Sequence, residues 1–110
     1  MTAFRGVPVE VAGTRAQRRR GLLGRDGLDG VFVIEPCRQV HSVGMRFPID
    51  VAFCARDGRV LRVSTIRPGR VSRVVWRSRF VVEAEAGRLR ALGVEPGMVL
   101  GVREHAAHDS

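Results

Sequence analysis

The chain has 110 residues, of which 45% are hydrophobic and 27% are charged. This length suits one domain with a modest core, and the apolar fraction excludes disorder as the default state. No apolar run approaches the roughly 20 residues that a membrane-spanning helix needs, and residues 1–13 lack the apolar core of a signal peptide. We therefore expect a cytoplasmic protein without a membrane partner, whose cysteines stay reduced.

The basic residues are unusual in kind. The net charge is +8, and all 19 basic residues are arginine, because the sequence contains no lysine. Such a charge favours anionic partners through the long-range field, without specifying which anion is recognised.

The first third of the chain predicts an edge strand, a short helix and a buried strand. Valines alternate over residues 7–11, where Pro8 is typical of a sheet edge. Thr14 is a suitable N-cap for a helix over Arg15–Leu23, which Gly24 would end. The continuous apolar run Val31–Ile34 is typical of a buried strand.

The middle of the chain predicts a hairpin. Gln39–Val43 is expected to be a strand, Gly44–Pro48 a tight connection, and Ile49–Ala55 a central strand. Asp57-Gly58 is the strongest hairpin turn in the sequence. That turn would pair Ala52 with Val63 and Cys54 with Leu61.

The last third predicts further strands and one helical turn. Residues 66–70 form a Pro-Gly loop, and residues 104–110 are expected to be a flexible tail. Between them we expect strands over Val71–Trp76 and Phe80–Glu85, a helical turn over Gly87–Leu92 stopped by Gly93, and a last strand over Met98–Val102. The elements together predict a mostly β fold: a compact single-domain, jelly-roll-like β-sandwich with one short N-terminal helix and a helical turn near the C-terminus.

Several motifs carry a family resemblance. They are Arg20-Gly21-Leu22-Leu23-Gly24-Arg25, His41-Ser42-Val43-Gly44-Met45-Arg46-Phe47-Pro48-Ile49-Asp50, Asp57-Gly58, and Glu83 with the later Ala86-Gly87, Gly93 and Pro96-Gly97. Through them the chain resembles the domain of unknown function 192 family over nearly its whole length. The resemblance implies a compact β-sandwich with one small helix, and it implies no reaction, since the family has no established biochemical role.

Cys37, His41 and Cys54 suggest a metal site, but their spacing argues against one. Positions four apart in an extended strand are separated by about 13 Å, too far to share one ion. We therefore expect packed thiols, no metal and no cofactor.

His41 and Asp50 flank the Gly44–Pro48 turn. A carboxylate that orients an imidazole would begin acid–base machinery, so an enzyme built on this pair is one hypothesis. The alternative is that Asp50 accepts hydrogen bonds from turn amides and His41 is a partly buried structural histidine. A register slip of one residue decides whether the two side chains face each other.

The leading hypothesis is a non-catalytic small-ligand-binding or accessory module that uses the face around His41–Asp50. Arg38 and Arg46 would suit a carboxylate or phosphate group through bidentate contacts. Met45 would form an apolar lip or plug the core. The expected ligand site therefore comprises Arg38, His41, Met45, Arg46 and Asp50, and the expected partner is a small anionic ligand.

An arginine-rich segment supports the other alternative, a nucleic-acid or anion binder. Arg59–Arg79 contains seven arginines, no acidic residue and the only tryptophan, Trp76. Charge for a phosphate backbone and a ring for stacking are what a single-strand surface needs. The competing interpretations are a merely solvated basic face and a Trp76 buried in the core, since no nucleic-acid-binding signature appears.

Overall fold

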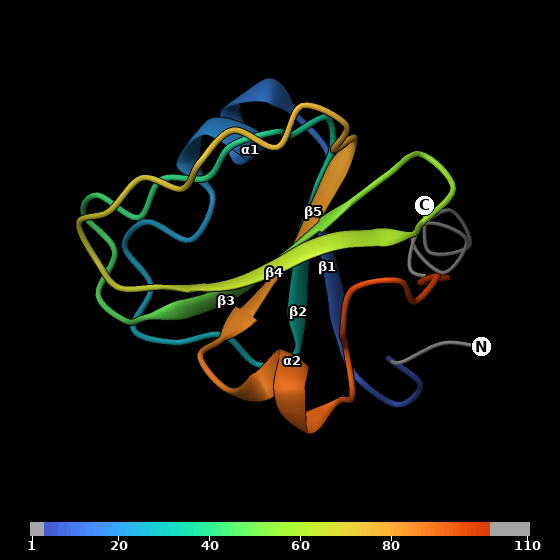
Figure 1. The fold of residues 1–110 in the computed structure, drawn as a ribbon. Helices are drawn as coiled ribbons and strands as arrows, with labels where there is room; N and C mark the ends of the chain where they lie inside the picture. Colours follow the sequence, from blue (N-terminus) through green and yellow to red (C-terminus); the bar gives the residue numbers. More distant parts are fainter. Residues whose placement is uncertain (1–3, 102–110) are drawn as a thin grey trace.

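A five-stranded mixed sheet forms the centre of the molecule (Figure 1). The computed structural model describes residues 4–101. The strands are β1 (Val9–Ala12), β2 (Val31–Ile34), β3 (Ile49–Cys54), β4 (Val60–Ile66) and β5 (Phe80–Glu85). Their order in the sheet is β1-β2-β5-β3-β4, with β1 parallel to β2 and the other neighbours antiparallel.

The sheet is buried on both faces. Every residue of β2 and β3 is buried, as are the first five of β5. Ile49, Val51 and Phe53 pack into the core on one face, and Ala52 and Cys54 pack into the core on the other. The mostly β prediction is confirmed. Because all five strands belong to one sheet, whose faces are covered by helices and irregular segments, the sandwich arrangement stays a prediction.

The hairpin at Asp57-Gly58 is confirmed with one change of register. Ala52 lies opposite Val63 as predicted, whereas Cys54 lies opposite Val60 because the register shifts between Phe53 and Cys54. The predicted pairing of Cys54 with Leu61 is therefore wrong by one residue, which is what an extra residue in one strand of a pair produces.

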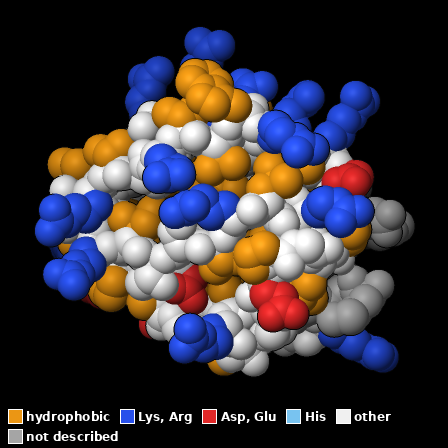
Figure 2. Space-filling model, in the orientation of Figure 1, with side chains coloured by type: hydrophobic (Ala, Val, Ile, Leu, Met, Phe, Trp, Pro, Cys, Tyr) orange, Lys and Arg blue, Asp and Glu red, His pale blue; other side chains and the backbone are white. Residues whose placement is uncertain are grey.

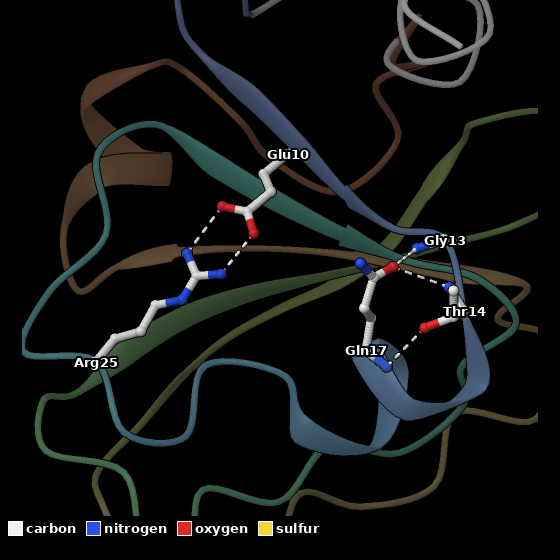
Figure 3. A network of polar contacts seen from close by, with 5 residues as sticks. All are labelled: Glu10, Gly13, Thr14, Gln17 and Arg25. Carbon is white, nitrogen blue, oxygen red and sulfur yellow. Dashed lines mark hydrogen bonds and ion pairs between the residues drawn. The ribbon is translucent and has the colours of Figure 1, made fainter.

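The first helix, α1 (Arg15–Arg20), is shorter than the sequence predicted. It ends at Gly21, which has a φ of +52°, and not at Gly24. At its start, Thr14 and Gln17 form the capping box of Figure 3. Gln17 Oε1 accepts hydrogen bonds from the backbone N–H of Gly13 and Thr14, and Thr14 Oγ1 accepts one from that of Gln17.

The predicted strands Gln39–Val43 and Val71–Trp76 are wrong as regular strands. The segments do lie side by side, but only His41 and Val71 form an isolated bridge. Backbone bonds join the segments beside this bridge, from the N–H of Ser72 to the carbonyl of Val40 at 2.8 Å and from the N–H of Val75 to that of Arg38 at 2.8 Å. Serine side chains add to them: Ser72 Oγ accepts from the N–H of Val40, and Ser42 Oγ donates to the carbonyl of Arg70.

The C-terminal part contains α2 (Arg88–Ala91), which confirms the helical turn before Gly93. The predicted last strand is not formed over its described residues: Val99 makes an isolated bridge with Arg59. Val102 and the expected tail lie outside the described residues. None of the helices within residues 4–101 is long and apolar enough to cross a membrane.

Candidate functional site

A small cavity lies between α1, the segment after it, and one face of the sheet. Its volume is about 70 Å³. Residues 18–23 and 39–41 form much of its wall, together with Ile34, Met45 and Glu83. We call it the α1 cavity. It has room for a group of a few heavy atoms, since one water needs roughly 10–15 Å³ on the same measure.

Glu83 is the chemically distinctive group of the α1 cavity. It lies on β5 opposite Val51 and is only 3% exposed. Burial alone raises the pKa of its carboxyl group from 4.5 to about 7. No donor among the described residues hydrogen-bonds this carboxyl. Every fully buried side-chain nitrogen or oxygen among those residues does have a hydrogen-bond partner. The oxygens of Glu83 are therefore not fully buried, and they reach the cavity.

Two contacts fix the α1 wall of the cavity against the sheet (Figure 3). The capping box fixes the start of α1. Beyond the helix, Arg25 Nη1 donates a hydrogen bond to Glu10 Oε1 at 2.8 Å, and the guanidinium lies 5.4 Å from the centre of the Phe32 ring. The bond from Arg25 lowers the pKa of Glu10, so the pair stays ionised. The segment between these anchors supplies Arg18–Leu23.

The cavity wall includes three arginines of α1 in sequence, Arg18, Arg19 and Arg20. Arg18 is half-buried, and the other two are exposed. Among the described residues, none of the three is in an ion pair. The α1 cavity therefore combines a buried acid whose pKa is raised with positive charge that no acid among the described residues neutralises.

Two of the sequence-predicted ligand residues line the α1 cavity. His41 is exposed at its wall, and Met45 is buried, 8% exposed, within the core on this face. The core alternative for Met45 is thus confirmed, and its side chain also contributes to the cavity. Gln39, which the sequence did not single out, lies beside His41 in the same wall.

The two predicted anion-binding arginines do not line the α1 cavity. Arg38 Nε donates a hydrogen bond to the carbonyl oxygen of Trp76 at 3.0 Å. Arg46 forms an exposed ion pair with Asp26, with 2.9 Å between Nη1 and Oδ1. The arginines that line it come from α1, which the sequence did not connect with a site.

Asp50 lies on the other face of the sheet, opposite Ala84. It accepts hydrogen bonds from Thr65 Oγ1 at 2.7 Å, from the N–H of Gly87 at 2.8 Å and from that of Leu89 at 3.2 Å. Its oxygens thus brace the start of α2. For Asp50 the structural alternative is observed, with α2 in place of the Gly44–Pro48 turn. The expectation of a partly buried His41 is wrong, because His41 is exposed, and the structure does not bring Asp50 to it.

Both cysteines are free thiols. Burial raises the pKa of Cys37 to about 11 and that of Cys54 to about 12, which suppresses the reactive thiolate. Within residues 4–101, no three His, Cys, Asp or Glu side chains lie close enough to hold a metal ion.

Sequence reasoning missed Glu83 as a candidate site residue. The signal was an acidic residue inside the otherwise apolar strand Phe80–Ala84. That signal is ambiguous, because an acid at this position suits a solvated sheet face equally well. Glu83 is buried because α1 and residues 37–48 cover this face of the sheet, and the sequence pattern of the strand does not show that covering.

Comparisons with known proteins agree on the fold and the family. A protein of unknown function from Novosphingobium aromaticivorans DSM 12444 has a similar structure, with a TM-score of 0.69, 22% sequence identity, and coverage of 81% of this chain and 70% of that one. A protein from Sinorhizobium meliloti 1021, described as a candidate transcription regulator, is similar with a TM-score of 0.68, 29% identity, and coverage of 81% and 76%. No curated protein matches the sequence. The model of one family, DUF192, described as "Uncharacterized ACR, COG1430", matches residues 2–102, and the chain therefore belongs to the DUF192 family.

Proposed function

We propose that this protein is a non-catalytic binding module that holds a small anionic group, such as a carboxylate, in the α1 cavity. One observation carries the proposal: the buried carboxyl of Glu83 reaches the cavity without a hydrogen-bond partner among the described residues. A buried polar group without a partner is costly unless something else satisfies it. A ligand that exchanges a hydrogen bond with Glu83 would do so.

The charges around the cavity favour an anion. Arg18, Arg19 and Arg20 are not neutralised by an acid within the described residues, so they attract an anion and oppose the entry of a cation. Near neutral pH a substantial fraction of Glu83 is protonated, because burial raises its pKa to about 7. The protonated acid donates its O–H to the anion, and the arginines balance the anion's charge.

The size of the cavity limits the ligand. About 70 Å³ holds a carboxylate with a short alkyl tail, or the end of a longer molecule. Leu22, Met45 and the aliphatic lining suit such a tail. Drug-sized ligands need pockets of roughly 300–1,000 Å³, so the α1 cavity is too small to enclose one.

The test is a titration with acetate, propionate and butyrate, followed by NMR of the backbone amides between pH 6 and 8.5. These ligands stay ionised over that range, so any pH dependence comes from the protein. We expect chemical-shift changes at the backbone amides of residues 21–23 and 39–41. The affinity should fall about tenfold per pH unit above pH 7, because the fraction of protein with a protonated Glu83 falls in that proportion.

Two variants assign the effect. Glu83→Gln keeps a neutral donor, so its affinity is expected to be flat with pH. A pH dependence that persists unchanged in this variant would refute the role of Glu83. Arg18→Gln is expected to weaken binding about tenfold, or about 1.4 kcal/mol. Arg15→Gln on the same helix removes the same charge outside the lining and serves as the control. Binding of butylammonium that strengthens with pH, or no shifts with any carboxylate, would refute the proposal.

A further inference from the structure

A separate basic surface lies along the irregular segment 67–79, which we call the Arg–Trp loop. Its arginines recur at intervals of two to four residues, and all of them are exposed: Arg67, Arg70, Arg73, Arg77 and Arg79. The loop contains no acidic residue. In Figure 2, basic side chains crowd the upper edge of the molecule, where α1 and this segment lie in Figure 1, and hydrophobic side chains stand among them.

Trp76 is the unusual residue of the Arg–Trp loop. Its side chain is 78% exposed, so the expectation that it belongs to the core is wrong. Tryptophan is highly buried on average, and an indole left in water forgoes a large hydrophobic gain. In the sequence it follows Arg73 by three residues and directly precedes Arg77, and both arginines are exposed.

The backbone that carries Trp76 is held in place although the ring is free. The carbonyl of Trp76 accepts a hydrogen bond from Arg38 Nε at 3.0 Å. On one side the N–H of Val75 donates to the carbonyl of Arg38 at 2.8 Å, and on the other Ser78 Oγ donates to the carbonyl of Cys37 at 2.7 Å. A platform that is already ordered loses less entropy when a ligand binds.

We infer that the Arg–Trp loop binds single-stranded nucleic acid, with phosphates along its arginines and one base stacked on Trp76. Exposed guanidinium groups without acidic neighbours complement a linear polyanion, and an exposed indole between them offers a stacking face to an unpaired base. In a duplex the bases are already stacked on each other, so they are not free to stack on Trp76. Among residues 4–101 no helix exceeds six residues, so this part of the chain has no helix long enough to fill the major groove of a duplex.

An anionic membrane surface fits the loop less well. Interfacial binding buries an apolar face several residues wide. Here the exposed Trp76 is followed directly by Arg77, and Val75 before it is half-buried and packs against the core. Val71 is also exposed, but it lies five residues earlier, where it pairs with His41.

The single tryptophan makes the test direct. Because Trp76 is the only tryptophan, its fluorescence reports the loop alone. Titration with a 12-nucleotide oligo(dT) or oligo(U) is expected to quench it as a base stacks, and to raise the anisotropy of a labelled strand in parallel. Trp76→Leu is expected to weaken binding about 5- to 150-fold, the equivalent of 1–3 kcal/mol for one stacked base, whereas Trp76→Phe is expected to keep most of it.

A pair of double variants separates local contacts from net charge. Arg73→Gln with Arg77→Gln and Arg88→Gln with Arg90→Gln each remove two charges, the second pair from the exposed face of α2. Only the first pair is expected to weaken binding strongly and to reduce the slope of log K against log salt concentration by about 1.4, since each single-strand phosphate contact contributes about 0.7. Equal weakening by both pairs, binding without quenching, or vesicle binding that survives Trp76→Leu while oligonucleotides fail would overturn the inference.

Discussion

Replacing Glu83 with glutamine should stabilise the protein at neutral pH and leave its stability unchanged in acid. The carboxyl of Glu83 is buried, and the pKa in the folded protein rises from its ordinary value of 4.5 to about 7. Below pH 4.5 the acid is protonated in both the folded and unfolded states, so its burial carries no charge penalty. Between pH 4.5 and about 7 the unfolded chain ionises while the folded carboxyl stays protonated, so stability is lost progressively. The loss is complete once the folded protein holds a desolvated carboxylate above pH 7.

The magnitude follows from the difference between the two pKa values. One pKa unit corresponds to about 1.36 kcal/mol, so a rise from 4.5 to about 7 amounts to about 3 kcal/mol. Glutamine has nearly the same shape as the protonated acid and does not ionise. We therefore expect Glu83→Gln to match the wild type near pH 4.5 and to exceed it by about 3 kcal/mol at pH 8.

Urea unfolding followed by far-UV circular dichroism at a series of pH values measures this difference. The exposed Trp76 makes fluorescence a weak reporter of global unfolding, since its surroundings change little. Subtracting the wild-type curve from the variant curve cancels all other titrating groups. A difference that is flat from pH 4.5 to 8, or one that grows toward low pH, would refute the assignment of Glu83 as an unpaired buried acid.

Two further pairs of substitutions test the fold. Asp50→Ala leaves the buried N–H of Leu89 without an acceptor and should cost about 1–3 kcal/mol more than Asp50→Asn, which keeps one acceptor oxygen; equal losses in urea unfolding would contradict the bracing role of this carboxylate. Gly58 has a φ of +92°, and an added Cβ would lie 2.4 Å from a backbone carbonyl oxygen, whereas Gly69 has a φ of +81° and open space. Gly69→Ala should cost the left-handed penalty of about 1–2 kcal/mol, and Gly58→Ala clearly more, so similar melting temperatures for the two variants would show that the clash is relieved by backbone movement.

The apolar runs and the strongest turn made the centre of the sheet predictable from sequence. Val31–Ile34, Ile49–Cys54 and Phe80–Glu85 are β2, β3 and β5, because continuous apolar runs need burial on both faces. The segments Gln39–Val43 and Val71–Trp76 have similar propensities but stay irregular. The reason is tertiary: β3 already pairs with β4 on one edge and β5 on the other, so neither edge remains for residues 39–43.

The same pairing explains why the site was sought in the wrong place. Sequence reasoning joined His41 to Asp50 across a presumed hairpin, and that hairpin does not exist. His41 pairs instead with Val71 of the Arg–Trp loop and lines the α1 cavity. Once β3 is placed, side-chain alternation assigns Asp50 to the face of the sheet that does not carry the α1 cavity. Alternation does not reveal which segments cover each face.

The contrast between the two buried acids, Asp50 and Glu83, links stability to ligand binding. Asp50 receives three hydrogen bonds and serves the fold, whereas Glu83 receives none among the described residues and lowers stability when it ionises. An anion that accepts a hydrogen bond from the protonated carboxyl of Glu83 favours the protonated form. It should therefore raise the pKa of Glu83 in the folded protein further. Saturating propionate should therefore move the upper end of the difference curve, the pH at which the loss of wild-type stability is complete, above pH 7. It should also stabilise the wild type more at pH 6 than at pH 8.5. A cation would move that upper end the other way, because it favours the carboxylate. The direction of this one shift thus identifies the charge of the ligand, independently of where on the chain the amide signals move.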